Sequence, residues 1–132
     1  MPYTYKVYST YDEIQQAARK AVQNRVCMPA GELRDHYRDI LSHRNIENYL
    51  CVIIVSHNGT PISSCLAWRN YQSLIEFQVF VRREHRRKHI GSNLYTICTK
   101  RMKAKKILKR NESLYVIRWN KTSKNFFDDV ER

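Results

Sequence analysis

Three strand-like runs follow one another through the middle of the chain, and they restrict the possible folds more than any other feature. The runs are residues 48–56, 61–69 and 74–81, and the first is dense in β-branched residues. Asn58 and Gly59 stand between the first two runs. An Asn-Gly pair between two such runs is the strongest short-range signal for a tight hairpin. The middle of the chain is therefore predicted to form an antiparallel meander.

A strand and two helices are predicted before this meander. Residues 3–9 alternate and are rich in tyrosine and valine, which is typical of a short strand. Thr10 and Glu13 have the spacing of a helix capping box, and apolar residues then recur at helical intervals. Residues 28–31 break this helix, and a second amphipathic helix follows.

A helix, a strand and a short final helix are predicted after the meander, at residues 90–107, 113–119 and 121–130. The helix joins strand 74–81 to strand 113–119 as a crossover, so these two strands should be parallel. The predicted order is β-α-α-β-β-β-α-β-α. This order indicates an α/β (α+β) fold with a mixed, mostly antiparallel sheet flanked by helices.

Length and hydropathy favour a single soluble domain. The chain has 132 residues, which suits one domain over residues 1–132. Its longest apolar run, residues 50–55, is far shorter than the roughly 18 residues that span a bilayer. The first ten residues lack the apolar segment of a signal peptide. A cytoplasmic protein without a membrane span is therefore expected.

Neither the cysteines nor the histidines predict a metal site. The four cysteines form no C-x-x-C pair and lie mostly in apolar stretches, where free cysteine behaves as a small hydrophobe. His85 and His89 have the spacing of two ligands on one helix. Arginine and lysine stand between them, however, and their charge repels a cation. Free thiols and no metal are expected.

The charge of the chain points to an acidic partner. Lysine and arginine number 24 against 12 aspartates and glutamates, a formal charge of +12. Such an excess favours phosphates, RNA or an acidic protein surface and disfavours small cationic molecules. Seven basic residues lie in and just beyond the third predicted helix: Lys100, Arg101, Lys103, Lys105, Lys106, Lys109 and Arg110. The alternative is a lysine-rich face that serves only solubility.

The segment between strand 74–81 and the following helix has the composition of a phosphate site. Arg86, Arg87 and Lys88 precede a helix that starts near Gly91. A helix N-terminus offers unpaired N–H groups and partial positive charge. Glycine lets a ligand approach the backbone, and Ser92 adds a donor. The alternative is an exposed basic turn before an ordinary helix.

This segment resembles the pyrophosphate-binding motif R/Q-x-x-G-x-G/A of the GNAT superfamily of N-acetyltransferases. Arg86 matches the leading residue, Gly91 the second glycine, and Leu94 the apolar residue that anchors the helix. His89 stands where the first glycine is usual. Histidine accepts unusual backbone angles better than most residues, so this departure does not end the match.

A second motif and the element order extend the resemblance over nearly the whole chain. The family often shows N-x-x-A/S-x-x-F/L-Y after the crossover strand, and this chain has Asn120, Ser123, Phe126 and Phe127 at that spacing. Phe127 replaces a tyrosine that protonates the leaving thiolate in relatives, and phenylalanine has no proton to give. Two further C-terminal strands of many relatives are expected to be missing.

The resemblance implies acetyl-coenzyme A as cosubstrate and direct attack of an amine on its thioester. It also implies that the cofactor lies along the strand backbone and on the amides of the basic loop. The implied cofactor-binding residues are Val79, Val81, Arg86, Arg87, Lys88, His89, Ile90, Gly91, Ser92, Asn120 and Phe127.

The resemblance implies Glu76 as the base that takes the proton of the amine. Relatives often carry this glutamate one residue earlier, where this chain has Ile75. A shift of one residue turns a strand side chain to the other face, so a solvent-facing Glu76 is the alternative. Residues His36, Tyr37, Trp68 and Asn70 lie where relatives line the acceptor pocket, or else belong to the core.

Two functions are compatible with these residues. The first is an N-acetyltransferase whose acceptor amine the sequence leaves open. The second is a GNAT-fold binding protein with weak or lost catalysis, favoured by Phe127, that acts through its basic surface on RNA or an acidic protein. A homodimer is compatible with either function.

Overall fold

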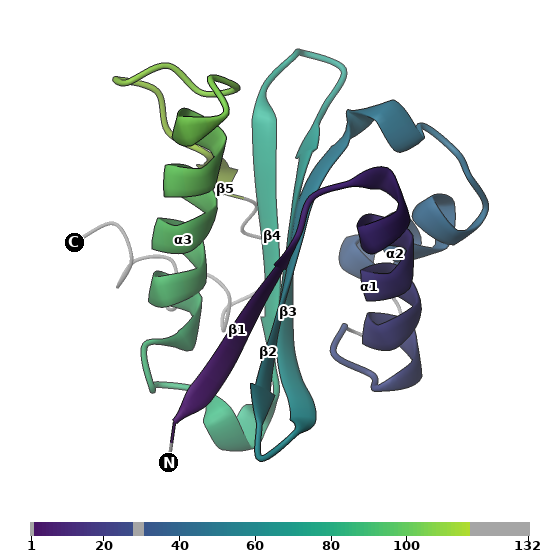
Figure 1. The fold of residues 1–132 in the computed structure, drawn as a ribbon, viewed down its shortest axis with the longest axis vertical. Coiled ribbons are helices and arrows are strands. Elements are labelled where there is room, and N and C mark those ends of the chain that lie inside the picture. The colour runs from purple at the N-terminus through teal and green to yellow at the C-terminus, as the bar shows by residue number, and fades with distance from the viewer. Residues whose placement is uncertain (1, 28–30, 117–132) are drawn as a thin grey trace.

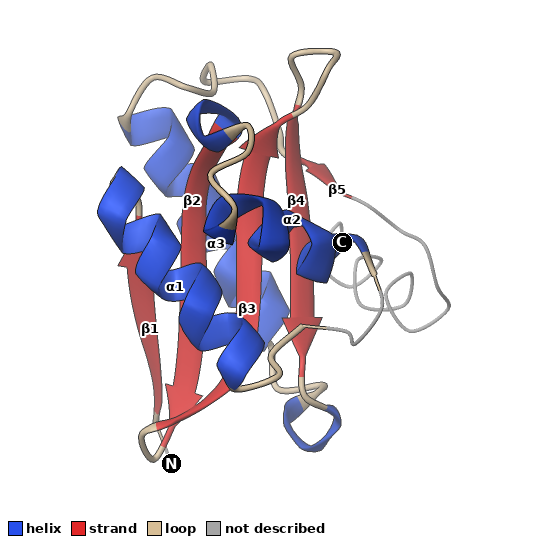
Figure 2. Ribbon diagram, turned by 90° about the vertical axis from the view of Figure 1, so that its right-hand side faces the viewer, coloured by secondary structure: helices blue, strands red, loops and turns tan. Residues whose placement is uncertain are grey.

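The computed structural model describes residues 2–27 and 31–116, which form one sheet between two helical layers (Figures 1 and 2). Helix α3 covers one face of the sheet, and α1 and α2 cover the other. The strands are β1 (Tyr3–Tyr8), β2 (Tyr49–His57), β3 (Thr60–Arg69), β4 (Ile75–Val81) and β5 (Tyr115–Val116). The helices are α1 (Tyr11–Gln23), α2 (Glu32–Leu41) and α3 (Ile90–Ala104), with 3-10 turns η1 (Ile46–Asn48) and η2 (Arg83–His85).

The sheet has the predicted mixed topology. Its strand order is β1-β2-β3-β4-β5, and the first three pairings are antiparallel. Strands β4 and β5 are parallel, with Glu76 opposite Tyr115 and Phe77 opposite Val116. The crossover prediction is therefore confirmed. The end of the last predicted strand, the final helix, Asn120 and Phe127 lie outside the described residues.

The hairpin between β2 and β3 forms at the predicted Asn-Gly pair. Asn58 has a φ of 52° and Gly59 a φ of 81°, as the two central positions of a type I′ turn require. His57 faces Thr60 across this turn. The turn fixes the direction in which β3 returns along β2.

The predicted capping box begins α1. The Thr10 hydroxyl accepts a hydrogen bond from the Glu13 amide, and the Glu13 carboxylate accepts one from the Thr10 amide at 3.1 Å. These backbone hydrogen bonds lower the pKa of Glu13.

Among the described residues, every helix is too short or too polar to cross a bilayer.

Each face of the sheet carries its own apolar core. The α3 side buries Ile53, Cys65 and Phe77 with residues of α3, including Leu94 and Met102. The side that faces α1 and α2 has a second core, which includes Ile14, Ala17, Leu33, Tyr37, Ile40, Val52, Ile54 and Leu66. Two cores on two faces require strands in which both alternating sets of side chains are largely apolar.

Tyr37 belongs to this second core. It is fully buried, and its hydroxyl donates to Ser64 Oγ at 2.8 Å. Ser64 in turn donates to the carbonyl oxygen of Val26 at 2.6 Å. This chain of hydrogen bonds ties α2 and the end of α1 to β3. Of the two uses predicted for Tyr37, core packing is therefore the one that the structure shows.

The basic residues of the third helix are exposed as predicted. Lys100, Arg101 and Lys103 lie on α3, and the remaining four basic residues, from Lys105 to Arg110, follow its end. All seven are exposed.

All four cysteines are buried and free. The prediction of unpaired thiols is therefore confirmed.

Replacing Gly59 by alanine should destabilise the protein. A Cβ at this position meets no atom within 4 Å, so the loss comes from the positive φ alone, which costs an L-residue about 1–2 kcal/mol. Urea unfolding of Gly59→Ala should show a lower free energy of unfolding than the parent. Asn58→Gly, at the other left-handed position of the turn, is the control and should not destabilise. Equal stability of Gly59→Ala and the parent would contradict the turn assignment.

Candidate functional site

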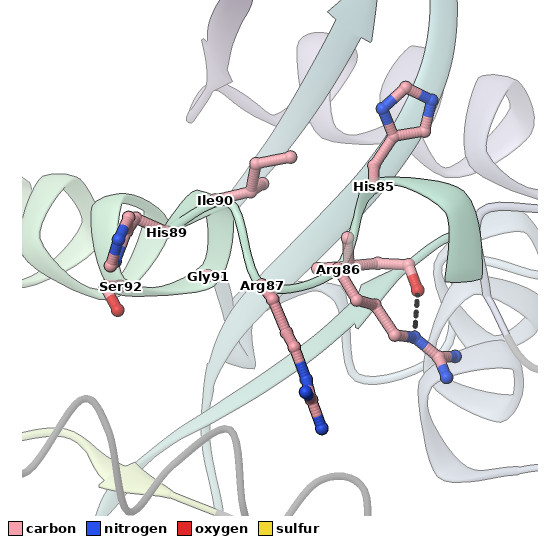
Figure 3. A pocket seen from close by; sticks show the side chains of 8 residues that line it. His85, Arg86, Arg87, His89, Ile90, Gly91 and Ser92 are labelled. Atoms are coloured by element: carbon pink, nitrogen blue, oxygen red, sulfur yellow. Dashed lines mark hydrogen bonds between the residues drawn. The ribbon is translucent and has the colours of Figure 1, made fainter.

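A pocket of about 300 Å³ lies between the end of β4 and the start of α3 (Figure 3). The loop around it leaves β4 at Val81, passes through η2, and takes left-handed backbone at Arg87 (φ 63°) and His89 (φ 60°). His89, which stands at the usual first glycine of the motif, thus takes a conformation that favours glycine, while that of Arg87 has no signal in the sequence. The lining residues are Val81, His85, Arg86, Arg87, His89, Ile90, Gly91 and Ser92.

The start of α3 presents unused amide donors to this pocket. The first intrahelical bond runs from the amide of Asn93 to the carbonyl oxygen of His89, at 3.0 Å. The amides of Ile90, Gly91 and Ser92 precede it and have no intrahelical acceptor. The N-cap residue makes no side-chain cap, and the first turn contains no acidic residue. This end of the helix therefore suits an anion supplied from outside.

The arginines of the loop have different tasks. Arg86 Nε donates to the carbonyl oxygen of Val81 at 2.9 Å, which ties the loop to the end of β4 (Figure 3). The guanidinium of Arg86 also lies 5.9 Å from the centre of the Phe80 ring. Arg87 lines the pocket without such a bond in Figure 3. Arg86 therefore positions the loop, and Arg87 adds positive charge beside the helix start.

Two predicted cofactor residues lie outside the lining of this pocket. Lys88 is exposed on the loop. Val79 is partly buried on β4, where it packs against the core on the α3 side.

His85 and His89 do not share a helical face, because His85 ends η2 and His89 caps α3. His85 instead shares a hydrogen bond with the Tyr3 hydroxyl at 3.0 Å.

A second pocket, of about 440 Å³, lies on the α2 side of the sheet. It brings together four residues that the sequence singled out, namely Glu76, His36, Trp68 and Asn70. It also contains residues that the sequence reasoning missed: Glu32, Asp35, Asp39, Tyr71 and Gln72. The three acidic residues of α2 share one face with His36 at intervals of three and four, which was a visible signal.

Glu76 is held in this pocket by two donors. Trp68 Nε1 donates to its Oε1 at 2.9 Å, and Asn70 Nδ2 donates to its Oε2 at 2.7 Å. Strand β3 pairs with β4 without a register shift from Ser63–Val81 to Arg69–Ile75. Alternation therefore turns Ile75 to the α3 core and Glu76 to the pocket. Glu76 is partly buried there, and both of its carboxylate oxygens accept hydrogen bonds.

His36 lies against the carboxylates and is 9% exposed. Burial lowers its pKa, although the charges of Glu76, Glu32, Asp39 and Asp35 act in the opposite direction. The two carboxylates Glu32 and Glu76 and the His36 ring place ligand atoms within 4.8 Å of one another. Such a group has the geometry to surround a small cation, a possibility that the sequence did not indicate.

Tyr49 fixes the orientation of His36. Its hydroxyl lies 2.9 Å from His36 Nδ1 and interacts with Asp39, and desolvation raises its pKa. This hydrogen bond is compatible with either tautomer of the neutral ring, because the hydroxyl can donate or accept.

The two pockets lie at opposite ends of β4 and carry opposite charge. Glu76 and Val81 are five residues apart, about 17 Å along a strand. Arginines line the pocket at Val81, and four carboxylates line the pocket at Glu76. The two pockets therefore suit ligand groups of opposite charge.

The chain matches the model of the acetyltransferase (GNAT) family over residues 11–129. One similar solved structure is an aminoglycoside N-acetyltransferase, AAC(6')-Iy, in complex with CoA, at 11% identity and a TM-score of 0.64, covering 98% of this chain and 88% of that one. Another is a predicted acetyltransferase from Clostridium acetobutylicum with acetyl-CoA, at 9% identity and a TM-score of 0.61, covering 97% and 88%.

A third similar structure is a ribosomal-protein-alanine N-acetyltransferase from Brucella melitensis biovar Abortus 2308. Its identity is 9% and its TM-score 0.60, and the alignment covers 98% of this chain and 91% of that one. At these identities the likeness concerns the fold. The comparison with curated protein sequences gave no significant match.

The buried His36 should make stability depend on pH. Because burial lowers its pKa in the folded protein, the unfolded chain binds the proton more readily. The contribution of neutral His36 to stability is therefore present above the unfolded pKa of about 6.5 and is lost as pH falls below it. The free energy of unfolding lost in His36→Gln should be larger at pH 8 than at pH 5. Urea unfolding at both pH values measures it, and a pH-independent difference would contradict the burial effect.

Proposed function

Because the chain belongs to the GNAT family of acetyltransferases, we propose that its two pockets bind the two substrates of one acetyl transfer. The protein is an acetyl-CoA-dependent N-acyltransferase that transfers an acetyl group to an amine. The uncapped N-terminus of α3, open to the pocket beside Val81, is the observation that carries the residue-level proposal.

Acetyl-CoA binds with its pyrophosphate at the start of α3. The amides of Ile90, Gly91 and Ser92 donate to the phosphate oxygens, and Arg87 adds a charge-assisted bond. Arg86 holds the loop against Val81. The pantetheine arm then runs along β4 past Val79 toward Glu76, over the distance of about 17 Å that five strand residues span.

The acceptor amine enters the pocket on the α2 side. Its nitrogen lone pair attacks the thioester carbonyl carbon, the new N–C bond forms, and the C–S bond breaks to release the coenzyme A thiolate. The amine proton passes to Glu76, which Trp68 and Asn70 hold in place. His36 lines the same pocket and, because burial lowers its pKa, offers a second neutral proton acceptor. The thiolate takes a proton from solvent.

The cysteines favour direct transfer over an acyl-enzyme. All four are buried. Desolvation raises the pKa of Cys27 and Cys65, and the hydrogen bond with Cys51, together with burial, raises that of Cys98. Only a thiolate is an effective nucleophile. Cys51 has a lowered pKa because of its bond with Cys98, but its side chain lies within the α3-side core.

The exposed basic residues of α3 and its C-terminal extension support a further part of the proposal, an acidic macromolecular partner. Arg87 and the amides at the start of α3 bind the cofactor phosphates in this proposal, so the charge from Lys100 to Arg110 has no role in the reaction above. Its exposure suits electrostatic contact with an RNA backbone or an acidic protein face. Exposed lysines that serve only solubility are the alternative.

Gly91→Trp should abolish acetyl-CoA binding. Gly91 lines the 300 Å³ pocket, and an indole there covers the amides that hold the pyrophosphate. The parent should bind with micromolar affinity, about −8 kcal/mol. Isothermal titration measures both proteins. Thr96→Trp places the same side chain at an exposed position of α3 and should bind as the parent does. Unchanged affinity of Gly91→Trp would overturn the pocket assignment.

Glu76→Gln should slow transfer and spare the cofactor. Loss of a general base lowers kcat by about 10²–10⁴-fold, while the pocket at Val81 is untouched. Thiol release with saturating amine measures the rate, and titration measures acetyl-CoA affinity. Intact-mass spectrometry without amine should show no acetylated protein. An acetylated cysteine, or an unchanged rate in Glu76→Gln, would count against this mechanism.

Binding of total tRNA or of an acidic protein pool should fall steeply with salt, because charged contacts release counterions. A variant with Lys103, Lys105, Lys106 and Lys109 changed to glutamate should bind far less. The control changes four other exposed basic residues to glutamate: Lys6, Arg19, Lys20 and Arg44. Equal binding by the two variants would show that only net charge matters and would remove the α3 surface from the proposal.

A further inference from the structure

The pocket beside Glu76 is acidic in a strongly basic protein. Four of the chain's 12 acidic residues line it, and none of its lining residues is lysine or arginine within the described part of the chain. Three of the four, Glu32, Asp35 and Asp39, come from one face of α2. The local charge is therefore opposite to the net charge of +12.

The acidic face of α2 is unfavourable for the helix alone. Asp35 and Asp39 are four residues apart, and like charges at that spacing repel. Glu32 and Asp35 lie in the first turn, where the helix dipole compensates them. Asp39 lies near the other end of α2, where the dipole disfavours a carboxylate. A cation bound between these side chains removes the repulsion.

Aromatic rings form the wall of the pocket opposite α2. The Trp68 ring centre lies 4.4 Å from that of His36 and 6.2 Å from that of Tyr71. Tyr71 is 94% exposed, although it is a large side chain. Trp and Tyr faces attract ammonium groups through their ring quadrupoles. Carboxylates on one side and aromatic faces on the other both select a positively charged ligand.

A buried acceptor beside the pocket lacks a donor. Gln78 is 2% exposed, and its Oε1 has no hydrogen-bond partner among the described residues. Its Nε2 donates to Glu32 Oε2 at 3.0 Å, so this amide holds one of the pocket's carboxylates in place. The four carboxylates that line the pocket can only accept hydrogen bonds when they are ionised. A ligand rich in N–H donors therefore fits this lining.

We propose, on the basis of the acetyl transfer above, that the acceptor is a small flexible polyamine. One of its primary amines, in the neutral form, attacks the thioester carbon and gives its proton to Glu76 as the coenzyme A thiolate leaves. Its remaining ammonium groups lie between the carboxylates of α2 and the rings of Trp68 and Tyr71. The pocket volume of about 440 Å³ suits a ligand of that size. The basic surface elsewhere repels a lysine-rich protein, which favours the small molecule.

The test compares amines of one length and different charge. Pentylamine and cadaverine differ by one ammonium group, and spermidine adds a third nitrogen. The full chain, with acetyl-CoA and EDTA present, should show a kcat/KM for cadaverine and spermidine at least ten times that for pentylamine. Equal kcat/KM values for the three amines, or a higher value for a lysine peptide, would overturn the polyamine as acceptor. Neither result would contradict the proposed acetyl transfer.

A binding measurement separates this inference from the catalytic proposal. Titration of spermidine into the protein–CoA complex requires no turnover and should show binding that weakens with salt. Absence of binding overturns the inference, whether or not transfer occurs. Binding without any acetyl transfer supports the acidic site and overturns the proposed reaction. Binding that EDTA abolishes would assign Glu32, His36 and Glu76 to a metal ion instead.

Asp35→Asn and Asp12→Asn form a matched pair of variants. Both aspartates are exposed and lie in the first turn of a helix, so both changes remove the same favourable interaction with the helix dipole. Only Asp35 lines the pocket. Asp35→Asn should raise the KM for spermidine several-fold without changing acetyl-CoA affinity, and Asp12→Asn should change neither. Equal effects of the two variants would overturn the assignment of α2 to acceptor binding.

Discussion

The alternation of side chains along β4 is the constraint on which both pockets depend. Phe77 and Val81 turn toward α3 and join the core that holds this helix in place. Glu76 and Gln78 turn toward α2 and meet its acidic face. The register with β3 has no shift over this length, so neither set changes sides. Strand β4 thus supports α3, whose first amides face one pocket. On the other face of the sheet, the same strand presents the carboxylate of Glu76 to the second pocket.

The ends of α1 and α3 show how capping separates a structural helix from a binding helix. At α1, Thr10 and Glu13 satisfy each other's backbone amides, so two of the four amides without an intrahelical acceptor are already used. At α3, His89 gives no side-chain cap and the first turn has no carboxylate. The left-handed backbone of Arg87 and His89 brings this uncapped end to the mouth of a pocket. Unpaired N–H groups destabilise a helix end that is buried. At the start of α3 they face a pocket, where a phosphate can accept from them.

Net charge and local charge lead to different conclusions about partners. The value of +12 describes the long-range field, which favours acidic macromolecules. The pocket at Glu76 is governed by groups a few ångströms away, where the carboxylates of α2 outweigh a distant excess of lysine. The net charge therefore does not exclude a cationic acceptor. In the proposed reaction, cofactor phosphates and acceptor amine are attracted to different ends of one strand by fields of opposite sign.

The sequence by itself determined what depends on neighbouring residues. The turn at Asn58 and Gly59 and the capping box at Thr10 follow from local sterics and hydrogen bonding, and both are confirmed. The order of strands and helices followed from periodicity. Only the tertiary structure decided which way Glu76 faces, because its face depends on the register of strands that are paired across a turn. It also decided that the carboxylates of α2 meet the rings of β3, since residues distant in sequence share a pocket only after the helix packs on the sheet.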